Sequence, residues 1–112
     1  MGVTVYEKPT CTTCRKLSRL LAERGIEFES VEYHVTGLSE EEVRELLAMA
    51  GITAAEALRL REPGARELRD AGEDAIVAAM AERPELLQRP FVVADGRAVL
   101  ARPIERALEV LG

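Results

Sequence analysis

An Asp-Gly pair stands between two short apolar runs near the end of this chain. Residues 91–94 (Phe-Val-Val-Ala) precede Asp95-Gly96, and residues 97–100 (Arg-Ala-Val-Leu) follow it. Both central residues of the tightest hairpin turn need positive φ angles, which Asp-Gly tolerates, so this pattern predicts two antiparallel strands joined directly. The sheet of this chain cannot then be wholly parallel.

The first third of the chain predicts a strand, a helix and a second strand. The first strand covers residues 3–7 and ends at Pro9. From Thr12 to Arg24 the leucines have helical spacing, and Gly25 is expected just beyond the helix end. The second predicted strand includes Ile26, Phe28 and residues 31–35. A helix between two strands favours parallel pairing through a right-handed crossover.

The rest of the chain predicts a helical region before the hairpin and one helix after it. Ser39 and Glu42 form a capping box before a helix that ends at Gly51, and shorter helices are predicted at 54–60, 65–71 and 74–82. Pro103 opens the final helix, whose buried face is Ile104, Ala107, Leu108 and Leu111. The order β-α-β, helical insert, β-β-α predicts an α/β, thioredoxin-like fold with a four-stranded mixed sheet. We expect one domain, residues 1–112, with the insert at about 39–83.

Both cysteines lie where the first strand gives way to the first helix. Cys11 precedes Thr12 and faces the unpaired backbone N–H groups of the first helical turn, which can lower a thiol pKa from about 8.5 to roughly 3.5–7.5. Cys11 is therefore predicted to be a thiolate nucleophile. Cys14 lies one helical turn on, within disulfide reach, so the pair can act as a dithiol switch. The alternative reading is two inert, half-buried thiols.

Composition restricts the partners and the compartment. The 112 residues include 20 acidic and 15 basic ones, for a net charge of −5, which disfavours a broad nucleic-acid-binding face. No apolar run approaches the roughly 20 residues of a membrane span, and the N-terminus lacks a signal-peptide layout. We therefore expect a cytoplasmic monomer that binds neither membrane nor nucleic acid directly. With two cysteines and one histidine, His34, on a different predicted strand, a zinc site is not expected.

Three separated segments carry a family resemblance that spans nearly the whole chain. They are residues 6–11 (Tyr-Glu-Lys-Pro-Thr-Cys), 87–93 (Leu-Gln-Arg-Pro-Phe-Val-Val) and 100–103 (Leu-Ala-Arg-Pro). The chain resembles the ArsC family of thioredoxin-fold proteins, which contains glutaredoxin-linked arsenate reductases and the Spx transcription regulators. The resemblance implies that Cys11 is the nucleophile and that Arg59, Arg89 and Arg102 hold the oxyanion, with Arg61 replacing Arg59 in a shifted register. It also implies a cis peptide bond before Pro90.

The family resemblance implies a redox reaction without a bound cofactor. The Cys11 thiolate would attack arsenate, and glutathione with glutaredoxin would reduce the adduct. An arginine guanidinium suits such an anion because its planar fork stays charged and binds oxygens in pairs. Without the resemblance, Arg89 and Arg102 would be read as solvated or as paired with Glu105 and Glu109.

Two departures from the reductase pattern keep an alternative open. Arsenate reductases of the family commonly have His-Asn before the proline, where this chain has Glu7-Lys8, and a hydroxyl residue at the position of Cys14. Cys-Thr-Thr-Cys-Arg-Lys instead resembles the redox switch of Spx. Cys14 could resolve the Cys11 adduct and shift the electron donor to thioredoxin. The chain could also be a Spx-like regulator that binds RNA polymerase, or an enzyme for an oxyanion other than arsenate.

Overall fold

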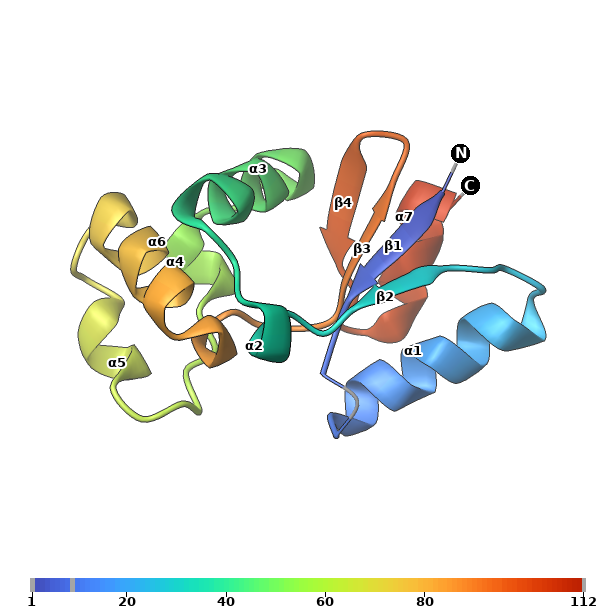
Figure 1. The fold of residues 1–112 in the computed structure, drawn as a ribbon, viewed down its shortest axis with the longest axis horizontal. Helices are drawn as coiled ribbons and strands as arrows, with labels where there is room; N and C mark the ends of the chain where they lie inside the picture. The colour runs from blue at the N-terminus through green and yellow to red at the C-terminus, as the bar shows by residue number, and fades with distance from the viewer. Residues whose placement is uncertain (1, 9, 112) are drawn as a thin grey trace. The chain divides into compact units, whose positions relative to one another are not determined.

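The computed structural model describes residues 2–8 and 10–111 and contains one four-stranded mixed sheet within them (Figure 1). In spatial order the strands are β2 (Glu29–Val31), β1 (Val3–Tyr6), β3 (Phe91–Ala94) and β4 (Arg97–Leu100). β1 pairs in parallel with β2, whereas β1 with β3 and β3 with β4 are antiparallel. The predicted four-stranded mixed sheet, with its first two strands parallel and its hairpin antiparallel, is therefore confirmed. Pro9, the expected end of the first strand, is outside the described residues.

The chain divides into two compact units. One contains the described residues up to Tyr33 together with those from Arg89 onward, and it holds the whole sheet. The other is His34–Gln88, which is mainly helical and encloses the predicted insert. That residues 1–112 make up a single domain stays a prediction. Among the described residues, no helix has both the length and the apolar character needed to cross a membrane.

One face of the sheet carries the core of the first unit. Val5, Val92 and Val99 are direct cross-strand neighbours and are nearly or fully buried. Because side chains alternate along a strand, the three valines point to the same side. Helix α1 (Thr12–Glu23) packs there through Leu17 and Leu21. The chain end packs beside it, as the 3₁₀ helix η2 (Ile104–Ala107) and helix α7 (Leu108–Leu111).

The second strand is shorter than predicted, and the expectation of a strand through residues 31–35 is wrong. β2 ends at Val31, where its register partner Tyr6 ends β1 and the N–H of Glu7 donates to the Val31 carbonyl at 3.0 Å. Beyond that point β1 offers no further backbone for pairing. The chain instead forms the short helix α2 (Tyr33–Thr36), so His34 is helical and Val35 is 73% exposed.

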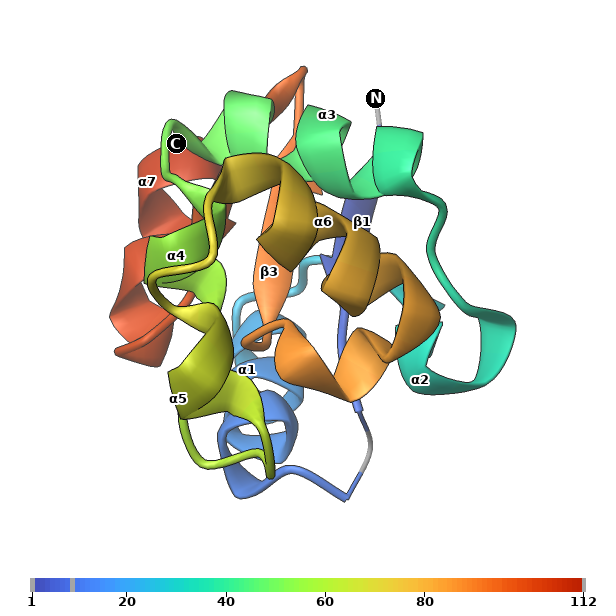
Figure 2. The ribbon, with the colours of Figure 1, turned by 90° about the vertical axis from the view of Figure 1, so that its left-hand side faces the viewer.

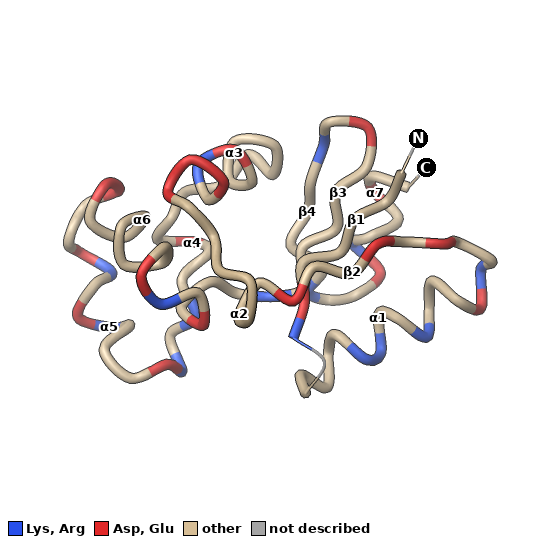
Figure 3. Tube along the Cα trace, viewed as in Figure 1, with Lys and Arg blue, Asp and Glu red and all other residues tan. Residues whose placement is uncertain are grey.

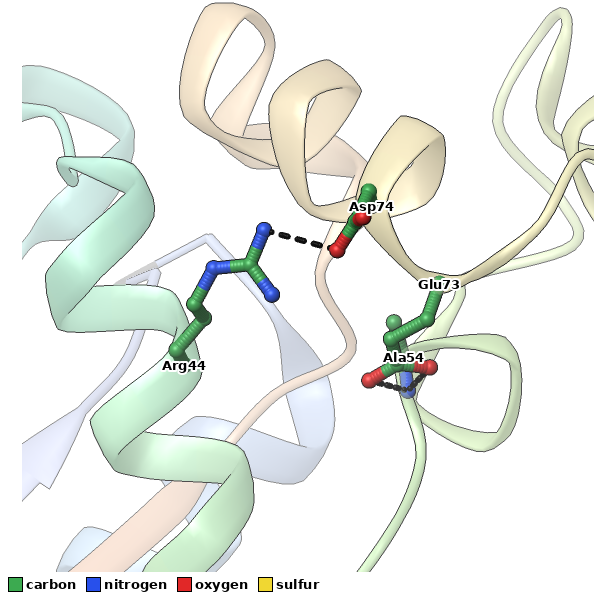
Figure 4. Close-up of polar contacts among 4 residues, drawn as sticks. All are labelled: Arg44, Ala54, Glu73 and Asp74. Carbon is green, nitrogen blue, oxygen red and sulfur yellow. Dashed lines mark hydrogen bonds and ion pairs between the residues drawn. The ribbon is translucent and has the colours of Figure 1, made fainter.

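The second unit is built from short helices, of which α3 (Glu40–Ala50) and α4 (Ala54–Ala57) begin with capping boxes. α3 starts with the predicted Ser39–Glu42 capping box and is followed by α4, α5 (Ala65–Leu68), α6 (Glu73–Glu82) and the 3₁₀ helix η1 (Pro84–Leu86). α6 packs against both α3 and α4, as Figure 2 shows. Arg44 on α3 pairs with Asp74 on α6 at 3.0 Å, and Glu73 accepts from the Ala54 N–H (Figure 4).

Four predicted helices need correction, three in their bounds and the last one in its type. α4 stops at Ala57 rather than residue 60 because Leu58 turns to extended backbone and bridges Leu87. α5 stops at Leu68 rather than residue 71, and α6 begins one residue early at Glu73, whose carboxylate reaches the start of α4. The predicted final helix begins as 3₁₀ and becomes α-helical only at Leu108.

The hairpin forms as predicted. Asp95 and Gly96 have φ angles of 53° and 75°, the positive values that a two-residue turn of this type requires. The turn holds β3 and β4 in the register Ala94↔Arg97. β3 is thus fixed between β1 and β4, and its N-terminal end lies directly after Arg89-Pro90.

Leu17 tests how strongly α1 is held on the sheet. Its side chain is fully buried among the core residues, so Leu17→Ala should cost about 2–5 kcal/mol of unfolding free energy. Chemical denaturation with urea measures this. Arg19→Ala on the exposed side of the same helix is the control and should change stability by less than about 0.5 kcal/mol. Equal stability of the two variants would contradict the packing described.

Candidate functional site

Cys11 is the residue at which the chain turns from the end of the sheet into α1. It is the N-cap of the helix, with extended φ and ψ of −77° and 124°. Its N–H donates to the Lys8 carbonyl at 2.9 Å, and its own carbonyl accepts the first helical hydrogen bond from Arg15 at 3.1 Å. The first turn of α1 carries no acidic residue. The Cys11 sulfur therefore lies at the positive end of a helix dipole.

The environment of Cys11 favours its thiolate. Partial burial opposes ionisation, but hydrogen bonds from the backbone and thiol of Cys14 and from the backbone of Thr13, together with the charge of Arg89, lower the pKa of Cys11. Each of these contacts stabilises negative charge on sulfur. The predicted nucleophile thus has the electrostatic surroundings that its role requires.

Cys14 has the opposite character. Its side chain is fully buried in α1, and burial raises its pKa to about 12; the backbone N–H of Lys8 opposes this effect, while Cys11 and Glu7 add to it. Both cysteines are reduced, and the Cys14 thiol donates to the Cys11 sulfur. The two sulfurs are therefore neighbours, one primed as a thiolate and the other held as a thiol.

Arg89 brings a positive charge to the cysteines. It precedes β3 and is 4% exposed, which is rare for an arginine without compensating interactions. Burial disfavours its charged form, but a hydrogen bond to the Tyr33 hydroxyl and the charges of Tyr33, Cys11 and Cys14 raise its pKa overall. The guanidinium is consequently charged and acts on both sulfurs.

Arg102 is joined to Arg89 through the backbone. Its Nη1 donates to the Arg89 carbonyl oxygen at 2.7 Å, so the segment after β4 is tied to the segment before β3. The peptide bond between Arg89 and Pro90 is cis, as predicted, and the Arg102-Pro103 bond is also cis. The Ala101 N–H donates to the Pro90 carbonyl at 2.8 Å and reinforces the same junction.

The other candidate arginines belong to the second unit. Arg59 follows α4, where its N–H donates to the Leu86 carbonyl and its Nε lies 3.6 Å from a Glu62 carboxylate oxygen. Arg61 is exposed. The structure thus brings Cys11, Cys14, Arg89 and Arg102 together within one unit, while the choice between Arg59 and Arg61 stays a prediction. Glu109, considered as a partner of the site arginines, pairs with Arg106 at 3.2 Å.

Two residues of this region were not identified as site residues from the sequence. Tyr33 was expected on a strand but is a fully buried α2 residue that contacts Arg89. Glu7 is 6% exposed and accepts hydrogen bonds from Ser18 and Ser30. A carboxylate in register with the buried Val5 was the available signal for Glu7. Within residues 2–8 and 10–111, no cluster of three or more His, Cys, Asp or Glu side chains suited to a metal ion is found.

Comparisons with known proteins agree with this fold. The model of the ArsC family matches residues 6–110. An arsenate reductase of Rhizobium meliloti is 36% identical, and the match covers 99% of this chain and 82% of that protein. The uncharacterized protein YfgD of Escherichia coli K12 is 38% identical, and the match covers 98% of this chain and 97% of that protein. The solved structure of an arsenate reductase from Vibrio cholerae superposes with a TM-score of 0.91 at 36% identity, covering 98% of each chain.

The fold is therefore that of the thioredoxin-like proteins with a cysteine at the start of the first helix. Within that class, the chain belongs to the ArsC family.

The two thiols should react with alkylating agents over different pH ranges. Because the pKa of Cys11 is lowered, a Cys14→Ser variant should react with iodoacetamide at a pH below that needed by a free cysteine. A Cys11→Ser variant should react only at a pH above that needed by a free cysteine, or after unfolding, because burial, the largest cause of the raised pKa of Cys14, remains. Mass spectrometry of pH-dependent labelling measures both rates. Faster labelling of Cys14 would reverse the assignment of the nucleophile.

Proposed function

We propose that this protein is an arsenate reductase-like thiol oxidoreductase whose nucleophile is Cys11. The observation that carries the proposal is the lowered pKa of Cys11 at the start of α1, beside the buried guanidinium of Arg89. Relatives named arsenate reductase, similar over nearly the whole chain, support the choice of oxyanion.

The first step is attack of the Cys11 sulfur on arsenic. A hydroxyl of arsenate leaves as water after taking up a proton, and a sulfur–arsenic bond replaces the arsenic–oxygen bond. Arsenic remains pentavalent, so no electrons are transferred yet. The helix dipole and Arg89 favour this step because they lower the pKa of Cys11 and so raise the fraction of thiolate.

The arginines would hold the tetrahedral anion during this attack. The charge of Arg89 acts on Cys11, and Arg102 donates to the Arg89 carbonyl, which supports a role for both arginines. Arg59, or Arg61 in its place, is the third arginine that the family resemblance implies. Such forks bind pairs of oxygens and stabilise the charge that builds up on them.

The second step reduces the adduct. A thiol attacks the Cys11 sulfur, the sulfur–arsenic bond breaks, and arsenic leaves with the electron pair as trivalent arsenite. With glutathione as the attacking thiol, the product is a mixed disulfide that glutaredoxin clears. With Cys14 as the attacking thiol, the product is a Cys11–Cys14 disulfide suited to thioredoxin. The neighbouring sulfurs favour the internal route.

The same pair of thiols supports a second candidate function. A Spx-like regulator that contacts RNA polymerase would need only the reversible Cys11–Cys14 disulfide, and the hydrogen bond between the two thiols is compatible with it. Arsenite formation distinguishes the candidates, because a regulator would show disulfide switching without arsenate turnover.

Substitution of each cysteine separates their roles. Cys11→Ser should abolish arsenite production with every donor, because the nucleophile is lost. Cys14→Ser should keep activity with glutathione and glutaredoxin but lose it with thioredoxin, because no internal disulfide can form. Arsenite is quantified in assays run with each donor system. Turnover by Cys11→Ser would refute the proposed nucleophile, and thioredoxin-supported turnover by Cys14→Ser would refute the internal route.

Lysine substitutions test whether Arg89 and Arg102 bind the oxyanion. Lysine keeps the charge but loses the planar fork, so each variant should lose charge-assisted hydrogen bonds worth about 1.5–3 kcal/mol, roughly 10- to 150-fold in kcat/KM for arsenate. Arg19→Lys is the matched control, because Arg19 is an exposed residue of α1. Figure 3 shows the Lys and Arg positions along α1 in blue. Unchanged kinetics in both site variants would favour the regulatory candidate.

A further inference from the structure

Glu7 is a buried carboxylate that the mechanism above does not use. It directly follows β1 in register with Val5, so its side chain points to the sheet face that α1 covers. It is 6% exposed and accepts hydrogen bonds from the Ser30 hydroxyl and, at 3.4 Å, from the Ser18 hydroxyl. Two hydroxyl groups from two different elements thus orient this carboxylate.

Cys14, which is on α1, lies next to the Glu7 carboxylate. Ser18 is four residues after Cys14, and residues at this spacing are neighbours on one side of a helix. The Cys14 sulfur also accepts a hydrogen bond from the backbone N–H of Lys8, the residue after Glu7, and it feels the Glu7 charge. The thiol and the carboxylate are therefore neighbours between α1 and the sheet.

The buried position of Cys14 raises a chemical problem for the internal disulfide. A thiol must lose its proton to attack the Cys11 sulfur, yet this thiol has no solvent exposure and its pKa is raised to about 12. Bulk water cannot readily take the proton from such a site. The Cys11 sulfur is no longer a base once it is bound to arsenic or to another sulfur.

We propose that Glu7 is the proton acceptor for Cys14 during disulfide formation, held in place by Ser18 and Ser30. The inference rests on the disulfide step of the proposed function. In that step the Cys14 sulfur bonds to the Cys11 sulfur, the group on Cys11 leaves with the bonding electron pair, and the Cys14 proton passes to the Glu7 carboxylate. Reduction of the disulfide returns the proton by the same route.

The surroundings of Glu7 suit a proton acceptor. Its hydrogen bonds come from the Ser18 and Ser30 hydroxyl groups, and its backbone N–H donates to the Val31 carbonyl. Its charge acts on the Cys14 thiol, and the Arg89 guanidinium acts on the same sulfur. The ion pairs found in the described part of the chain involve other carboxylates: Asp74, Glu62 and Glu109. A carboxylate neutralised by a nearby lysine or arginine would be a weaker base.

A chromogenic disulfide reagent tests this without arsenate. Dithionitrobenzoate converts Cys11 to a mixed disulfide and releases one thionitrobenzoate, and attack by Cys14 then releases a second. The first phase reports Cys11 reactivity and the second reports the Cys14 step. Because no oxyanion takes part, the measurement stays informative even if arsenate proves not to be the substrate. Cys14→Ser should release only the first equivalent.

Glu7→Gln keeps the shape of the side chain, and its amide can accept from one serine hydroxyl and donate to the other, but it cannot accept the proton. It should slow the second phase about a hundredfold at neutral pH while the first phase changes little. If Glu7 acted only by its charge, its removal would lower the pKa of Cys14 and speed the second phase. An unchanged or faster second phase would therefore overturn the proposal.

The pH profile separates proton transfer from a merely structural role. In Glu7→Gln the rate of the second phase should rise steadily with pH, as hydroxide replaces the lost base. Glu7→Asp keeps a carboxylate and should keep the weaker pH dependence of the unmodified protein. The same steep pH dependence in all three proteins would also refute the role. Glu29→Gln, at an exposed position of β2, controls for the change in net charge.

Discussion

The packing of α1 on the sheet face formed by Val5, Val92 and Val99 is the constraint on which the site depends. It sets the direction in which the helix leaves the end of β1, and so it fixes the position of Cys11 at the helix start. The same contact buries Cys14 and turns Glu7 toward the helix. The apolar core and the thiol chemistry are thus two results of one helix-on-sheet contact.

The site divides the work between two sulfurs by their surroundings. Cys11 receives backbone hydrogen bonds, a helix dipole and a nearby arginine, all of which favour negative charge. Cys14 is buried and lies near Cys11 and Glu7, and all three factors disfavour negative charge on its sulfur. A pair of chemically identical residues three positions apart therefore becomes one nucleophile and one protected thiol, and the order in which they react follows from that difference.

The sequence predicted those features that depend on local pattern. The Asp95-Gly96 hairpin, the Ser39–Glu42 capping box and the placement of Cys11 each rest on a few adjacent residues, and all three are observed. The strand was predicted to run on from Val31 to Val35 because the apolar residues there alternate as in a strand, but the end of β1 leaves the residues after Val31 without a strand to pair with. The importance of Tyr33 and Glu7 depends on partners distant in the chain, which a local pattern does not reveal.

The hydrogen bond between Tyr33 and Arg89 has a consequence for the segment it encloses. These residues are the last of the sheet unit before the chain enters His34–Gln88 and the first after it returns. The contact therefore holds the two ends of the segment His34–Gln88 side by side. In the unfolded chain this segment is flexible, and each doubling of its length adds only about 0.6 kcal/mol to the entropic cost of bringing its ends together. Changes in the length of this segment should thus destabilise the sheet far less than changes at Tyr33 and Arg89, which join its ends.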